Sequence, residues 1–458
     1  MLFQSQEFIL LLLPITLALY YAVADRPTAR QATLVLASLI FYGWWDARFV
    51  PLLLAHCAIA WAGPVLAQKT GRRAFIDAAI VLQFLSLAFF KYTNFLVANV
   101  EQATGIVLPK SDILLPIGIS FYTFQLVSYL IDVRRGHAPA HPLGSILLYI
   151  SFFPHLIAGP IVRHNELLPQ FAADPLRPGV AERLGKGLTL FIIGMAKKVL
   201  LADPLSRLAD PIFASAALAA SATSFGSAWT GALAFTFQLF LDFSAYSEMA
   251  IGLALMFGLI LPENFRNPYR ATSLRDFWRR WHITLATFLR DYVYIPLGGN
   301  REGSARYVLA VMVTMGACGL WHGAGWTYVT WGLLHGAGLI ACAAYQSLQR
   351  PLPAPVGWLL TMLFVIAGWV IFRSPTFAAA QDLLSAMAGF HGFSGRIQGR
   401  TLLIFAAAAS LLMPSSHELI ERWLKPWPSL AMPLAVTFAF MMLRINTEAP
   451  VNFIYFQF

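Results

Sequence analysis

The feature that most constrains this chain is a series of apolar blocks, many of them close to the length of about 20 residues that crosses a bilayer core. Hydrophobic residues make up 58% of the sequence and charged residues only 12%, and the mean hydropathy is +0.65. A soluble domain would carry roughly twice that charged fraction. The sequence therefore predicts an all-α, polytopic integral membrane protein.

The number of apolar blocks predicts about 11–13 transmembrane or re-entrant helices. Several blocks are too short for a full span, and Ser227–Phe257 is long enough to be two helices. The blocks are Phe8–Ala24, Gln31–Trp45, Phe49–Ala67, Ala74–Val97, Ile113–Ile131, Leu143–Gly159, Lys186–Leu201, Ser227–Phe257, Arg306–Leu320, Trp326–Ala344, Val356–Phe372, Thr401–Leu412 and Leu430–Leu443.

Basic residues suggest an orientation. The first seven residues hold Glu7 and no Lys or Arg, so we expect no cleavable signal peptide. Arg26, Arg72 and Arg134 follow the first, third and fifth blocks. The positive-inside rule places those loops in the cytoplasm and the N-terminus outside. With no repeat or soluble insertion in view, we expect residues 1–458 to form one integral membrane domain.

The net charge of +10 is explained mostly by positive-inside arginines and contacts with lipid headgroups, so no nucleic-acid partner is expected. Cys57, Cys318 and Cys342 lie in apolar segments without the spacing of metal ligands. We expect neither a disulfide framework nor a metal site.

The most informative polar break is residues 263–306, which hold eight arginines against four carboxylates. Ser273 is placed to cap a helix, and Asp276 suits the positive end of that helix and can pair with Arg280. Projected as one amphipathic helix, the segment carries aromatic and leucine side chains on one side. The opposite stripe consists of Arg275, Arg279, His282 and Arg290.

Two interpretations of this basic segment are open. It is an amphipathic helix on the cytoplasmic interface with its arginines at lipid headgroups, or it binds a polyanionic donor such as a coenzyme A thioester. In the second case arginines would hold the phosphates bidentately, and His282 would face the reactive end.

His322 lies in the apolar stretch Gly319–Trp326, where an ionisable side chain is costly unless something compensates for it, so a functional site is the first hypothesis. Alone it would be a packing histidine, but His282, 40 residues earlier, favours a catalytic pair. His322 could act as general base on an acceptor hydroxyl that attacks a thioester carbonyl. Gly323 and Gly325 would supply N–H donors to the oxyanion or serve helix packing.

Other polar residues in apolar blocks have less specific interpretations. On an unbroken helix His335 would lie about 20 Å and 220° from His322, so we expect a structural role. His56, His155 and His164 show no partner pattern and stay unassigned.

Buried charges form a second group of such residues. Asp242 and Glu248 could orient a histidine tautomer, but ion pairing between helices, for instance with Lys197 or Lys198, is favoured.

Several of these stretches together resemble the membrane-bound O-acyltransferase (MBOAT) family, especially its bacterial branch that serves alginate O-acetylation. The specific signatures are Arg-Trp-His at Arg280–His282 and Trp-His-Gly at Trp321–Gly323. The similar stretches are Leu115–Phe124, Gly159–Arg163, Lys197–Lys198, Asp242–Ser244, Pro262–Phe265, Phe277–His282, Arg290–Arg301, Trp321–Gly323 and Phe453–Phe458.

The resemblance implies a funnel of helices with a central tunnel, in which His322 is the catalytic histidine and His282 the second signature residue. It further implies acetyl transfer from cytoplasmic acetyl-CoA to an exported polysaccharide at the bacterial inner membrane. A periplasmic acetyltransferase or relay protein would be the partner, because the chain shows no large extracytoplasmic domain. Arg275, Arg279 and Arg290 would then hold acetyl-CoA.

Other functions stay open from sequence. A D-alanyl transferase fed by a carrier protein, and a peptidoglycan or cellulose acetyltransferase, fit the same residues. A transporter would often show repeat symmetry, which the sequence lacks. In an export scaffold the histidines would only pack.

Overall fold

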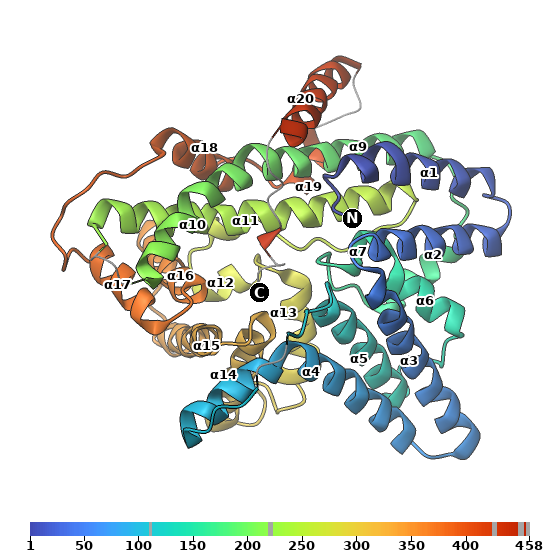
Figure 1. The fold of residues 1–458 in the computed structure, drawn as a ribbon, viewed down its shortest axis with the longest axis horizontal. Coiled ribbons are helices and arrows are strands. Elements are labelled where there is room, and N and C mark those ends of the chain that lie inside the picture. The colour runs from blue at the N-terminus through green and yellow to red at the C-terminus, as the bar shows by residue number, and fades with distance from the viewer. Residues whose placement is uncertain (110–111, 219–222, 424–427, 448–452, 455–458) are drawn as a thin grey trace. The chain divides into compact units, whose positions relative to one another are not determined.

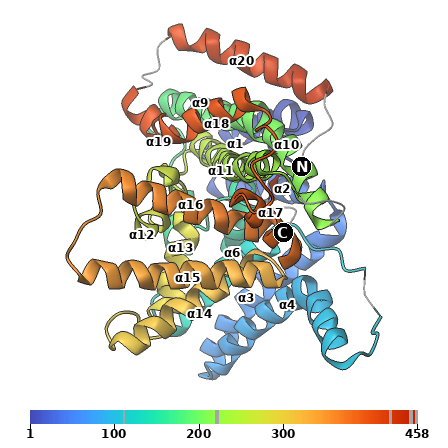
Figure 2. The same cartoon turned by 90° about the vertical axis from the view of Figure 1, so that its left-hand side faces the viewer.

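The computed structural model describes residues 1–109, 112–218, 223–423, 428–447 and 453–454. Within these ranges every regular element is a helix (Figures 1 and 2). Six of the described helices are long and apolar enough to cross a membrane, and a seventh span results if Arg400–Leu411 and Ser416–Arg422 form one bent span. The prediction of an all-α polytopic membrane protein is confirmed.

Fewer of the predicted blocks are full spans than their number suggested. Leu143–Gly159 becomes two short helices separated at Phe152, and Pro154 stands at the start of the second. Pro lacks a backbone N–H and is best tolerated in the first turn of a helix, where that N–H has no partner within the helix. Ser227–Phe257, in contrast, belongs to the single 32-residue helix α11 (Phe225–Met256). Of the predicted C-terminal stretch, Tyr455–Phe458 lie outside the described residues.

Two compact units share the chain, and each is assembled from separate segments. Unit 1 contains residues 1–193, 246–262 and 424–448. Its helices are α1 (Leu13–Ala22), α2 (Pro27–Gly43), α3 (Val50–Thr70), α4 (Ala74–Thr104), α5 (Ile119–Arg135), α6 (Leu143–Ser151), α7 (Phe153–Leu156), α8 (His164–Leu167), most of α9 (Val180–Ala196), the end of α11, and α20 (Pro428–Thr447).

Unit 2 contains residues 194–245, 263–423 and 449–458. Its helices are α10 (Asp203–Ala217), most of α11, α12 (Leu274–Trp278), α13 (Ile283–Leu289), α14 (Ser304–His322), α15 (Trp326–Ser347), α16 (Ala354–Arg373), α17 (Phe377–Met387), α18 (Arg400–Leu411) and α19 (Ser416–Glu418). Short π-helical turns at Lys197–Ala202 and Arg290–Tyr294 extend neighbouring helices. The prediction that the chain forms one integral domain stays a prediction.

Helix α5 is the polar centre of unit 1 and packs against α3, α4 and α6 (Figure 1). It is buried along most of its length. Gln125 Nε2 lies 2.8 Å from His155 Nδ1, and His164 Nε2 lies 3.2 Å from an Asp132 carboxylate oxygen. The third unassigned histidine, His56, is hydrogen-bonded to α4. All three therefore satisfy polar groups inside unit 1.

Helices α14 and α15 form a tightly packed hairpin in unit 2. A Cβ atom added at Gly319 would stand 2.2 Å from the Tyr328 carbonyl oxygen, and one at Gly332 would stand 2.2 Å from that of Met315. Contacting residues pair in opposite order along the two helices, Gly319 with Tyr328 and Met315 with Gly332, so the helices are antiparallel. Small residues allow this backbone approach between membrane helices. Helix α16 packs on the other side of α15 (Figure 2).

A buried ion cluster ties together separate segments of unit 2. Lys198 Nζ lies 2.7 Å from an Asp203 carboxylate oxygen and 2.8 Å from one of Asp242. The other Asp242 oxygen accepts from the Ile454 N–H at 2.6 Å, and the Phe453 ring lies 4.5 Å from Lys198 Nζ. The favoured prediction of ion pairing between helices is confirmed for Asp242 and Lys198.

We predict that Lys198→Ala destabilises the protein strongly, because it leaves two buried carboxylates without their cation. Removing one partner of a buried ion pair costs about 3–5 kcal/mol. The free energy of unfolding in detergent measures this. Lys186→Ala is the matched control, since that lysine forms a more exposed i,i+4 pair with Glu182 and should cost less than about 0.5 kcal/mol. Equal losses for both variants would contradict the prediction.

Candidate active site

The basic segment contains a short capped helix followed by a break. The Asp276 N–H donates to Ser273 Oγ at 3.1 Å, so the predicted cap is confirmed. The predicted Arg280–Asp276 pair is also present, at 2.9 Å. The projection of one continuous amphipathic helix is wrong, because α12 ends at Trp278 and α13 starts at Ile283.

The break occurs at His282, whose φ of 42° and ψ of 54° lie in the left-handed region. Such a conformation is uncommon for a residue with a Cβ atom. The neighbouring segment compensates, since the Ile283 N–H donates to the Asn264 carbonyl at 3.0 Å and the Arg266 N–H donates to the Arg280 carbonyl at 2.9 Å. Residues 264–266 therefore run beside the break and satisfy its backbone.

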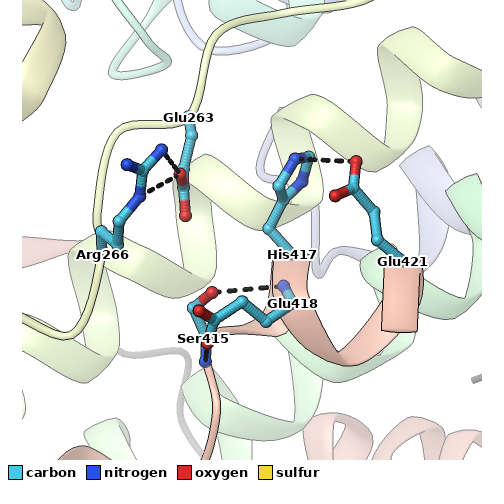
Figure 3. Close-up of polar contacts among 6 residues, drawn as sticks. All are labelled: Glu263, Arg266, Ser415, His417, Glu418 and Glu421. Carbon is cyan, nitrogen blue, oxygen red and sulfur yellow. Dashed lines mark hydrogen bonds and ion pairs between the residues drawn. The ribbon is translucent and has the colours of Figure 1, made fainter. Parts of the chain in front are cut away.

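An ion pair holds the start of that neighbouring segment. Arg266 donates to one Glu263 carboxylate oxygen at 3.0 and 2.7 Å (Figure 3). Hydrogen bonding to Glu263 raises the pKa of the Arg266 guanidinium above its ordinary value. Figure 3 also shows the Ser415–Glu418 capping box and the His417–Glu421 pair at 3.2 Å.

His282 is fully buried, and its protonation state follows from its partner. Its Nδ1 lies 3.0 Å from Asn264 Oδ1, an atom that also accepts from the Thr284 N–H at 3.3 Å and the Thr284 hydroxyl at 2.9 Å. An amide oxygen only accepts, so the imidazole proton is on Nδ1 and the lone pair is on Nε2. Burial lowers the pKa of His282 to about 3, and the ring is neutral at physiological pH.

The two signature histidines meet at one indole. The Trp321 ring centroid is 5.9 Å from that of His282 and 4.9 Å from that of His322. His322 is the last residue of α14, is 4% exposed, and also contacts Trp331 and Phe372 edge-on. The structure therefore brings the predicted pair into one aromatic cluster, although 40 residues separate them.

The glycines after His322 serve helix packing. The Gly323 N–H donates to the Gly319 carbonyl and the Gly325 N–H to the Gly323 carbonyl, at 3.3 and 3.0 Å. A Cβ atom at Gly323 would stand 2.3 Å from the Tyr328 ring. Of the two roles considered from the sequence, the structure supports close packing.

A cavity of about 690 Å³ lies beside this cluster in unit 2. Arg275 and Arg290 line it together with Trp278, and α14 contributes Thr314 and Met315. Its volume falls within the usual range for small-molecule sites, about 300–1,000 Å³.

The remaining predicted site residues do not line this cavity. Arg279 is exposed and is not part of the lining, and His282 and His322 are buried but are not among the lining residues either. The break at His282 separates Arg290 from Arg275 and Arg279, so the three arginines no longer lie on one continuous helix.

Two structural links connect the cavity to His322. Met315 is seven residues before His322 on α14, which corresponds to about 10 Å of rise and about 20° of rotation. On the other side, the Trp278 ring lies 6.0 Å from Trp331, whose ring lies 5.3 Å from His322. The cavity therefore approaches the catalytic candidate along one face of α14 and ends at an aromatic wall.

Asn264 is the hydrogen-bond partner of His282 that the sequence analysis did not identify. A carboxylate such as Asp242 was considered as the group that orients a histidine, but Asp242 is held by Lys198 and Ile454. Asn264 orients His282 instead. Its sequence signal was only its place in the stretch Pro262–Phe265, which resembles the family.

Comparison with known proteins agrees with this architecture. The model of the membrane-bound O-acyltransferase family matches residues 74–378. The chain is 42% identical to the probable alginate O-acetylase AlgI of Pseudomonas aeruginosa, over 85% of this chain and 75% of that protein. It is 36% identical to the peptidoglycan O-acetyltransferase of Helicobacter pylori, over 86% and 81%. Similarity to the teichoic acid D-alanyltransferase of Streptococcus thermophilus is lower, 29% over 49% and 56%.

The chain belongs to the membrane-bound O-acyltransferase family. It is a multi-pass membrane enzyme that transfers acyl groups to hydroxyls. The resemblance seen in its signatures is thereby confirmed, and the transporter and scaffold alternatives are set aside.

We predict that Asn264→Leu lowers acyl transfer about 10²-fold, because the His282 ring loses the partner that fixes its orientation. The free energy of unfolding should fall by about 1–3 kcal/mol for the buried donors left unpaired. Thr284→Val is the control, since it removes one donor to Asn264 and keeps the His282 contact. If Thr284→Val lowered the rate as much as Asn264→Leu, orientation of His282 would not be the cause.

Proposed function

We propose that this enzyme moves an acetyl group from cytoplasmic acetyl-CoA to hydroxyls of an exported, alginate-like polysaccharide. The proposal rests on the cavity, which Arg275 and Arg290 line, and on the face of α14 that runs from the cavity to His322. The relatives of known name supply the chemistry, because the more similar ones are O-acetylases and O-acetyltransferases.

The donor would bind with its phosphates at Arg275 and Arg290. Guanidinium groups suit phosphates because they offer paired, charge-assisted N–H donors. Arg279, exposed outside the cavity, would add attraction at longer range. Apolar and aromatic side chains such as Trp278 and Met315 would enclose the pantetheine arm on its way toward His322.

At the reacting end, the His322 imidazole would take the proton of an acceptor hydroxyl. The alkoxide oxygen then attacks the thioester carbonyl, a C–O bond forms, and the C–S bond breaks. The imidazolium returns the proton to the leaving thiolate. His282 would orient the thioester or the acceptor with Nε2, the ring nitrogen that carries the lone pair when the Nδ1 proton is donated to Asn264.

The relatives support the proposed acyl group and the polysaccharide acceptor. D-alanyl transferases match a smaller part of the chain at lower identity than the alginate O-acetylases do, which favours acetyl. We further propose the bacterial inner membrane as the location, where coenzyme A is available on one side. A periplasmic acetyltransferase or relay protein would receive the acetyl group for the polymer.

His322→Ala should lower acetylation of the exported polymer by about 10²–10⁴-fold, the usual contribution of a general base. Acetyl ester content per sugar, at equal abundance of the protein in membranes, measures this. His417→Ala is the control, because its half-exposed ring pairs with Glu421 one helical turn later and does not line the cavity. Wild-type acetylation in the His322 variant would refute the enzyme mechanism.

Arg275→Ala should raise the KM for acetyl-CoA roughly 10–100-fold, since hydrogen bonds to charged groups contribute about 1.5–3 kcal/mol. Arg279→Ala removes the same charge from a residue that does not line the cavity, so it should raise the KM no more than about threefold, the size expected for a screened charge without direct contact to the donor. Steady-state kinetics with purified protein tests both. A larger effect at Arg279 than at Arg275 would contradict the assignment of the cavity.

A further inference from the structure

His335 is a buried histidine that the mechanism does not use. It lies on α15, is fully buried, and does not line the cavity. Its Nδ1 accepts a hydrogen bond from the Trp278 indole N–H at 3.2 Å. Trp278 itself lines the cavity, so His335 contacts the donor site through one side chain.

The expectation that His335 is remote from His322 assumed an unbroken helix and is wrong in its premise. The chain reverses between His322 and Trp326, and α15 returns along α14. The Trp331 ring lies 5.3 Å from His322 and 4.8 Å from His335. One indole therefore touches both imidazoles.

The hydrogen bond also fixes the tautomer of His335. Because Nδ1 accepts from Trp278, a neutral ring carries its proton on Nε2. A Cβ atom at Gly368 of α16 would stand 3.2 Å from that Nε2 and 3.5 Å from the Trp331 indole nitrogen. Glycine thus leaves the room in which His335 and Trp331 keep their orientation.

We propose that His335 is a positioning residue that holds the Trp278 indole in the wall of the acyl-donor cavity, on the side facing His322. The inference rests on the proposed function, because it takes the cavity to be the acyl-CoA site. Trp278 lines the cavity, donates to His335 and contacts Trp331. When His335 no longer accepts the hydrogen bond, the Trp278 indole moves into the part of the cavity that acetyl-CoA needs.

The test is a double-mutant cycle on donor binding. His335→Leu keeps an apolar volume but accepts no hydrogen bond, and Trp278→Phe keeps an aromatic ring without the N–H. Each should raise the KM for acetyl-CoA at least fivefold with kcat within about twofold. The double variant should be no worse than the poorer single variant, because both remove the same contact. His335→Gln should restore a KM near wild type, because its amide oxygen accepts from Trp278.

Trp358→Phe is the matched control. Trp358 also donates its indole N–H, to the Tyr269 carbonyl at 2.9 Å, but it lies outside the cavity lining. Its KM should stay at the wild-type value.

Three results would overturn the inference: an unchanged KM in His335→Leu, additive effects in the double variant, or a glutamine variant as impaired as the leucine variant. A shared loss of thermal stability with no shift in KM would make His335 a packing residue. If the wild-type protein does not use acetyl-CoA, the proposed function itself fails. If it uses acetyl-CoA and the KM is unchanged in His335→Leu, only the role of His335 fails.

Discussion

The close approach of α14 and α15 is the constraint on which the functional part of unit 2 depends. Backbone carbonyls at Met315 and Tyr328 occupy the space that side chains at Gly332 and Gly319 would need. This contact turns the chain back directly after His322 and places Trp331 against that imidazole. A membrane-embedded histidine is thereby held at a helix end, beside a cavity rather than on a lipid-facing surface.

The second requirement is a neutral, oriented imidazole at His282. Its left-handed backbone is stabilised by hydrogen bonds with residues 264–266, and its ring proton is fixed by Asn264. In a buried site an ionised ring would be costly. A rotated ring would present Nδ1 instead of Nε2 to the substrate. The Lys198 cluster stabilises another part of unit 2. There the buried Asp242 of α11 pairs with Lys198 and accepts a hydrogen bond from the Ile454 N–H.

Sequence patterns predicted the features that depend on neighbouring residues in the chain or on average composition. Apolar block lengths indicated a helical membrane protein, Ser273 indicated a helix start, and spacing indicated the Asp276–Arg280 pair. Periodicity failed at His282, because a residue in the left-handed region is stabilised by a segment 18 residues earlier rather than by its neighbours. The contact between His335 and Trp278 was likewise hidden, since it spans 57 residues and depends on how two helices pack. The roles of the predicted site residues stay predictions.

The most direct measurement of the central claim is an experimental structure of the protein with a non-hydrolysable acetyl-CoA analogue. We expect phosphate density at Arg275 and Arg290 and the carbonyl carbon near the His322 ring, with His282 close by. An analogue bound elsewhere, or one whose acyl end points away from both imidazoles, would contradict it.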